Sequence, residues 1–149
     1  MTLLELQDVL GKAIVSIEDG TGSIDKAKAI ASLAKQMINN IGTVIRGRNH
    51  GARVKTENGY VAANAYFRKK YGRSKDEMII HLNGDLADFS ENNIEFVSKA
   101  IYSSLCWRKW LFTNPELTKT AILTAKLLEY FPDLRHNENQ FYGNRSDST

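Results

Sequence analysis

The sequence predicts an α+β fold: an N-terminal helical hairpin, a basic connector, a small strand–loop–strand–helix module and a C-terminal helix. In residues 1–46, apolar side chains recur at helical spacing, which predicts two amphipathic helices. Farther along, Met78–Ile80 is a short apolar run and Ile94–Val97 alternates around one charge, as strands do. The chain of 149 residues is long enough for one domain, or one small domain with an appendage.

Composition indicates an ordinary globular chain, with 42% hydrophobic and 25% charged residues. No apolar run has the length of a membrane span, and the N-terminus lacks the plan of a signal peptide. The single cysteine, Cys106, excludes an internal disulfide and fits a reducing compartment. We therefore expect a cytoplasmic protein with no membrane partner. Its expected segments are 1–46, 47–58, 59–112, 113–136 and a disordered tail at 137–149.

The N-terminal hairpin begins at a capping box formed by Thr2 and Glu5, and Ser23 caps its second helix. Glycines at 20 and 22 separate the two helices. Such a hairpin has too little core of its own, so it must pack against something else. The two alternatives are a homodimer through residues 1–46 and packing onto the C-terminal helix of the same chain.

The segment Gly47–Gly59 reads as a linker or as a β-ribbon that turns at Asn58-Gly59. A helix is predicted over Tyr60–Tyr71 and ends at Gly72. A further helix over Lys99–Phe112 follows the cap Ser98, and at least one of its two tryptophans is expected in the core. The last helix starts at Asn114-Pro115 and ends before Pro132.

Charge is unevenly distributed although the net charge is only +3. Between residues 46 and 75, nine Lys and Arg residues stand against one Glu, a local charge of +8, whereas residues 76–96 hold six acids and no Lys or Arg. A basic block of this kind suits a phosphate backbone, although a charged run is more often a solvated surface. The candidate DNA-binding residues are Arg46, Arg48, Arg53, Lys55, Arg68, Lys69, Lys70 and Arg73.

The stretch from Met78 to Tyr102 resembles the HNH endonuclease family in its phage and homing form, a His-Me finger module. The resemblance covers about residues 59–110. It is carried by His81, by Gly84-Asp85 in the polar turn, and by Asn93 before Ile94-Glu95-Phe96. It implies a ββα module in which His81 is the general base, Asn93 orients it and a divalent metal ion holds the phosphate. Apart from the family, a histidine beside Asn-Gly is often a turn residue with local hydrogen bonds.

Two positions depart from the family pattern. Ile80 stands where the family has a metal-binding Asp or His, and Tyr102 where it has Asn or His. Isoleucine offers no oxygen ligand to a hard cation, and a phenol keeps its proton up to about pH 10. We therefore expect a DNA-binding protein built on a degenerate, inactive HNH module, encoded by a phage or mobile element, with no cofactor.

Two alternatives remain open at this point. One is an active DNA endonuclease that uses Mg²⁺ or another divalent metal, with His81 as general base and Asp85 or Asp88 as an unrecognised ligand. The other is an adaptor that binds a protein partner through its N-terminal helices.

Overall fold

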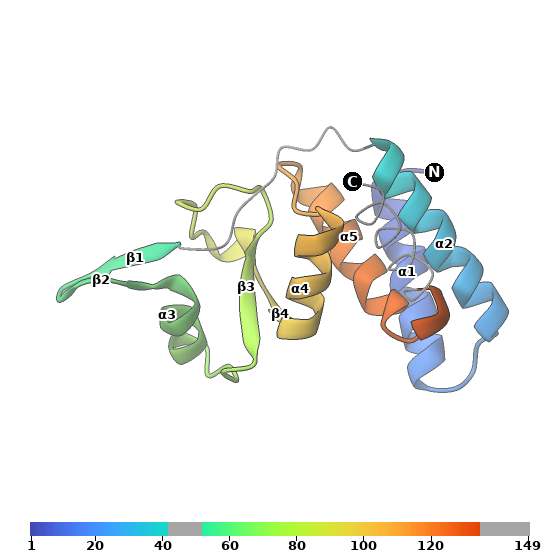
Figure 1. Ribbon diagram of the computed structural model, residues 1–149, viewed down its shortest axis with the longest axis horizontal. Coiled ribbons are helices and arrows are strands. Elements are labelled where there is room, and N and C mark those ends of the chain that lie inside the picture. Colours follow the sequence, from blue (N-terminus) through green and yellow to red (C-terminus); the bar gives the residue numbers. More distant parts are fainter. Residues whose placement is uncertain (42–51, 135–149) are drawn as a thin grey trace, which may run out of the picture. The chain divides into compact units, whose positions relative to one another are not determined.

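The computed structural model describes residues 1–41 and 52–134, which form two compact units (Figure 1). These residues contain the α-helices α1 to α5, one short 3-10 helix and two antiparallel two-stranded sheets, so the predicted α+β class is confirmed. One unit contains residues 1–41 and 123–134; the other contains residues 52–122. Arg46, Arg48 and the tail at 137–149 lie outside the described residues. Among the helices described, none combines the length and apolar character needed to cross a membrane.

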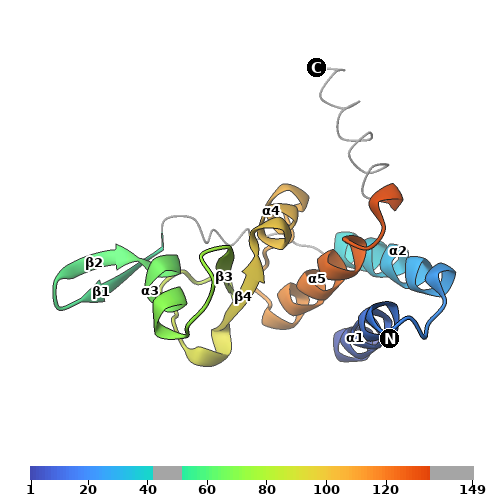
Figure 2. The ribbon, with the colours of Figure 1, turned by 90° about the horizontal axis from the view of Figure 1, so that it is seen from below.

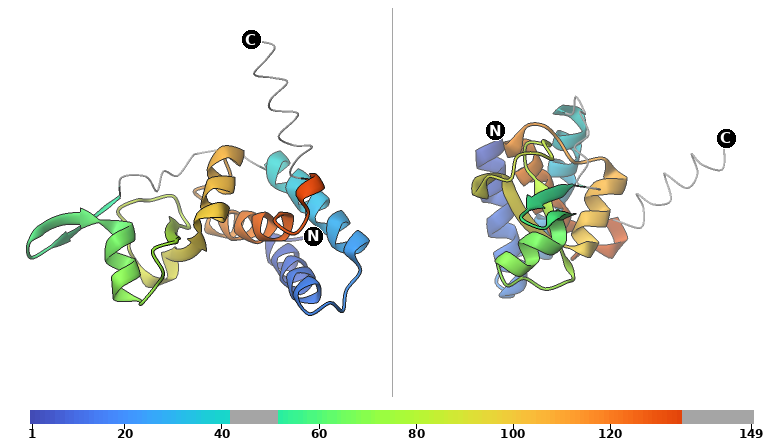
Figure 3. Two further views of the ribbon diagram at one scale, coloured as in Figure 1. Left: turned by 60° about the horizontal axis from the view of Figure 1, so that its bottom comes forward. Right: turned by 90° about the vertical axis from the view of Figure 1, so that its left-hand side faces the viewer.

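The first unit is built on α1 (Leu3–Glu18) and α2 (Ile24–Ile41), which lie side by side (Figure 3). The predicted cap forms, since the Glu5 amide donates to the Thr2 hydroxyl oxygen at 3.1 Å. The segment after α5 packs on this hairpin, with the Tyr130 hydroxyl donating to Glu18 at 2.9 Å. The hairpin thus packs against the end of its own chain. Large apolar side chains remain exposed on it, at Leu4, Val15, Ile24, Leu33 and Ile41, and a homodimer stays a prediction that light scattering can check.

A two-stranded ribbon opens the second unit. β1 (Arg53–Thr56) pairs with β2 (Gly59–Ala62), and Gly59 adopts φ +110° at the turn, a conformation that suits glycine. The predicted helix over Tyr60–Tyr71 is therefore wrong at its start, because residues 60–62 belong to β2 and α3 is Ala63–Lys70. The predicted boundary between residues 58 and 59 falls inside this ribbon.

A second hairpin forms the middle of this unit. β3 (Glu77–His81) pairs with β4 (Ile94–Ser98) so that His81 faces Ile94 and Ile79 faces Phe96. The 3-10 helix η1 (Glu91–Asn93) leads into β4. The β3–β4 hairpin lies between α3 and α4 (Lys99–Arg108), as both Figure 1 and Figure 2 show. Its α3 side carries a small core of Ala63, Phe67 and Ile79, with Val54, Phe89, Ile94 and Phe96 packed against it.

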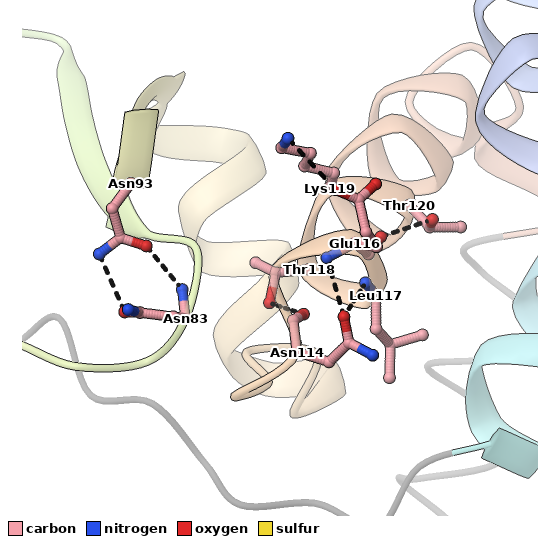
Figure 4. A network of polar contacts seen from close by, with 8 residues as sticks. All are labelled: Asn83, Asn93, Asn114, Glu116, Leu117, Thr118, Lys119 and Thr120. Atoms are coloured by element: carbon pink, nitrogen blue, oxygen red, sulfur yellow. Dashed lines mark hydrogen bonds and ion pairs between the residues drawn. The ribbon is translucent and has the colours of Figure 1, made fainter. Parts of the chain in front are cut away.

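The helix predicted over Lys99–Phe112 is shorter than expected. It ends at Arg108, because Lys109 adopts the left-handed conformation (φ 63°) and the Trp110 amide donates back to Leu105 at 2.9 Å. Trp110 is 2% exposed, which confirms that one tryptophan belongs to the core, whereas Trp107 is 36% exposed. The last helix, α5, is Pro115–Leu128, and the Asn114 side chain accepts from the Glu116 amide at its start, as predicted (Figure 4).

Candidate functional site

His81 closes β3 and is buried, with 2% of its surface exposed. Its ring packs against the Phe89 ring at a centroid distance of 5.3 Å and an interplanar angle of 67°. Because successive strand residues point to opposite faces, His81 shares its face with Ile79 in the α3-side core, whereas Ile80 points to the other face. A general base must reach the proton it removes. In this conformation the imidazole is shielded from a substrate.

Burial lowers the pKa of His81, and the Asp85 and Asp88 carboxylates partly oppose that shift. The folded protein therefore binds a proton to His81 less readily than the unfolded chain does. The proton-binding difference makes the free energy of unfolding decrease as pH falls below the ordinary histidine value of about 6.5.

We expect His81→Gln to remove this part of the pH dependence. Urea denaturation of both proteins between pH 7.5 and 5 checks it, because the other two histidines of the chain are the same in each. The unmodified protein should lose more stability over that range than the variant. An equal decrease in the free energy of unfolding of the two proteins would contradict a buried His81 that stays neutral.

The loop after His81 is closed by two asparagines, Asn83 and Asn93 (Figure 4). The Asn93 side-chain oxygen accepts from the backbone N–H of Asn83 at 2.9 Å. The Asn93 Nδ2 donates to Asn83 Oδ1 at 2.9 Å and to the backbone carbonyl of Asp88 at 3.0 Å. The Asn93 carbonyl also accepts from the Leu82 amide at 2.8 Å. Asn93, predicted to orient His81, thus bonds to the loop that follows it.

Asp85 and Asp88, the alternative metal ligands, also bond within this loop. Asp88 accepts from the Ser90 hydroxyl at 2.6 Å, from the Ser90 amide at 3.1 Å and from Asn83 Nδ2 at 2.9 Å. These hydrogen bonds, led by that of the Ser90 hydroxyl, lower the pKa of Asp88. Asp85 accepts from the Ala87 amide at 3.0 Å. Within residues 1–41 and 52–134, no three His, Cys, Asp or Glu side chains are grouped to hold a metal ion.

Ile80 and Tyr102, the two residues that the sequence resemblance aligns with metal ligands, offer little to a cation here. Ile80 is completely buried and lies on the face of the hairpin opposite to that of His81. Tyr102 lies on α4, where burial, together with the neighbouring Cys106 thiol, raises the pKa of the phenol to about 12. The hydroxyl therefore keeps its proton more firmly than an exposed tyrosine does.

The basic residues divide into two groups by their contacts. Arg68 is structural, since its Nη1 donates to the Lys75 carbonyl at 2.9 Å and to the Glu77 carbonyl at 3.1 Å, joining α3 to β3. Arg73 lies 4.8 Å from the centre of the Phe96 ring and 3.6 Å from the Glu77 carboxylate. Four candidates remain exposed without such a bond to a neighbouring strand: Arg53, Lys55, Lys69 and Lys70. The Nζ of Lys70 lies 5.5 Å from the centre of the Tyr71 ring.

Sequence reasoning missed the parts of this site that hold it in shape. Asn83 and Asp88 were available as signals, because Asn and Asp side chains commonly close turns by bonding to the backbone two residues on. Phe89, whose ring packs against His81, gave no signal, because a single aromatic in a polar loop has no periodic pattern.

Comparison of the chain with family models, curated protein sequences and solved structures finds no match.

Proposed function

We propose that this protein binds DNA through the exposed cations of residues 52–75 and that its HNH-like module does not cleave the bound strand. The observation that carries the proposal is the separation of charge. Seven Lys and Arg residues and one Glu give residues 52–75 a net charge of +6, whereas residues 76–96 contain six acids and no Lys or Arg. Nucleic-acid-binding surfaces concentrate cations on one part of a domain in this way.

The exposure of these cations supports phosphate contacts. Lys and Arg side chains that are already bonded within the fold would have to break those bonds to reach a phosphate. Within the described basic segment, Arg68 donates to two backbone carbonyls and Arg73 contacts the Glu77 carboxylate and the Phe96 ring, whereas Lys70 has only ring contacts with Phe67 and Tyr71 on its own side of the unit. Lys69 and Lys70 are exposed at the C-terminal end of α3, where a DNA phosphate backbone can reach them.

Three features support the absence of cleavage. His81 is shielded by burial, Ile80 supplies no ligand atom, and burial raises the pKa of Tyr102 to about 12. Phosphodiester hydrolysis of the HNH type needs an accessible base and a cation that stabilises the leaving oxygen. The module is therefore proposed as a scaffold that presents its basic side chains.

Charge reversal at Lys69 and Lys70 tests the proposal. We expect Lys69→Glu with Lys70→Glu to weaken binding at least tenfold, to a similar extent on unrelated duplexes, and to reduce the slope of log affinity against log salt by about two. Fluorescence anisotropy with labelled duplexes measures both. Arg68 is left unchanged, because its loss would disturb the junction of α3 and β3.

The matched control is Lys12→Glu with Lys26→Glu, which changes the net charge equally at exposed positions of α1 and α2. This control should bind DNA nearly as tightly as the unmodified protein. If it weakens binding as much as the α3 pair does, net charge alone acts and the basic segment is not the binding surface.

A further inference from the structure

The β1–β2 ribbon separates its side chains into two faces. Lys55 pairs with Tyr60 and Arg53 with Ala62, so these four residues share one face. Val54 and Val61 pair on the other face, and Val54 packs against the core under α3. The face of Arg53, Lys55 and Tyr60 therefore points away from that core.

Among the described residues, the contacts that hold the ribbon lie near its base. The Ala63 amide donates to the Ala52 carbonyl at 3.0 Å, and Val54 reaches the core. Beyond this, the strands extend away from α3 and the β3–β4 hairpin (Figures 1 and 3). Tyr60 is 64% exposed and Val61 38% exposed. A two-stranded hairpin is marginal by itself in water, so a projecting ribbon with an exposed aromatic ring is better explained by a partner than by stability.

We infer that this ribbon enters the major groove of duplex DNA, with Arg53, Lys55 and Tyr60 facing the base edges. The inference rests on the proposed DNA-binding function and specifies its geometry. The major groove of B-form DNA, about 12 Å wide, admits a two-stranded ribbon. Each strand has four residues and is therefore about 13 Å long, which is close to the width of that groove.

The rest of the basic segment fits this orientation. α3 follows β2 directly and is about 12 Å long at 1.5 Å per residue. Lys69 and Lys70 at its far end are thus spaced from the ribbon by a distance comparable to the width of the groove. They contact the phosphates that border it, which fixes the register, while the ribbon side chains contact bases.

The chemistry favours duplex DNA over other nucleic acids. The major groove of A-form RNA is too deep and narrow for side chains to read. Proteins that hold single strands present successive aromatic platforms. The outward ribbon face instead carries one aromatic ring, Tyr60, opposite Lys55, with Arg53 two residues along the same strand as Lys55. This combination suits base edges and thymine methyl groups.

The test uses the full chain and three 20-base-pair probes of one sequence: plain DNA, DNA with glucosylated 5-hydroxymethylcytosine, whose sugar fills the major groove, and duplex RNA. The variant Lys55→Thr with Tyr60→Thr removes the charge and the ring but keeps strand propensity. The matched control is Val61→Thr on the opposite face. Anisotropy titrations at one salt concentration give the affinities.

We expect the unmodified protein to lose at least tenfold in affinity on the glucosylated duplex and on duplex RNA. The ribbon variant should lose at least tenfold on plain DNA and less than threefold further on the glucosylated duplex, and Val61→Thr should bind like the unmodified protein. Equal affinity for plain and glucosylated DNA, tighter binding to single strands, or an unaffected ribbon variant would overturn the inference while leaving phosphate binding by Lys69 and Lys70 intact. Absence of binding to all probes at low salt would overturn the proposed function itself.

Discussion

Replacing Asn93 by alanine should lower the free energy of unfolding of its unit by about 3 kcal/mol. The substitution removes three side-chain hydrogen bonds and leaves the Asn83 amide and the Asp88 carbonyl without that partner in a part-buried loop. Each lost bond is worth about 1 kcal/mol, and a stranded buried group costs about 1–3 kcal/mol. Trp107 and Trp110 lie in the same unit, so their fluorescence during urea denaturation reports the change.

The neighbouring residue provides the control. Asn92 is exposed, and Asn92→Ala should change the free energy of unfolding by less than about 0.5 kcal/mol. Combining Asn93→Ala with Asn83→Ala should cost clearly less than the sum of the single changes, because the two side chains bond to each other. A loss below 1 kcal/mol for Asn93→Ala would mean that the loop does not depend on this network.

Introducing ligands at the two departures from the HNH pattern should create a metal site. Ile80→Asp with Tyr102→Asn places an acid at a fully buried position, which should destabilise the metal-free protein by about 3–5 kcal/mol. A divalent ion that binds the folded variant should restore stability, by about 2.7 kcal/mol at one hundred times its dissociation constant. We expect Mn²⁺ or Mg²⁺ to raise the melting temperature of the variant and to leave that of the unmodified protein unchanged.

The same variant tests whether metal binding also exposes the buried His81 ring: if it does, the variant should gain metal-stimulated nicking of plasmid DNA. Adding His81→Ala should abolish nicking while preserving the metal-dependent rise in melting temperature, which separates the base from the ligands. Nicking by the unmodified protein with Mg²⁺, abolished by His81→Ala, would contradict the proposed inactivity and support the endonuclease alternative.

Local signals in the sequence predicted much of the fold. Thr2, Ser98 and Asn114 each precede a helix, and each accepts a backbone amide in the structure, because a capping side chain acts within one turn. The strand runs around Ile79 and Phe96 were likewise readable from their apolar pattern. The start of α3 was not, because Tyr60-Val61-Ala62 fits either structure locally and only pairing with β1 decides it.

The sequence predicted which residues belong to the candidate site better than it predicted their contacts. The sequence indicated His81 and Asn93, but their surroundings depend on packing between distant segments. Phe89 contacts His81 in a loop that the hydrogen bond from Asn83 to Asp88 closes. Arg68 and Lys69, adjacent in the sequence, differ in role because Arg68 alone of the two bonds to the carbonyls of residues 75 and 77. Charge counts cannot make that distinction.

The salt dependence of duplex binding by the unmodified protein tests the central proposal most directly. If the basic segment contacts about three to five phosphates, log affinity should fall with log salt with a slope of about −3 to −4.5. Affinity should then drop by at least roughly 40-fold between 50 and 200 mM salt. Binding that stays constant across this range, or no binding to DNA at 50 mM salt, would contradict a DNA-binding protein that acts through the cations of residues 52–75.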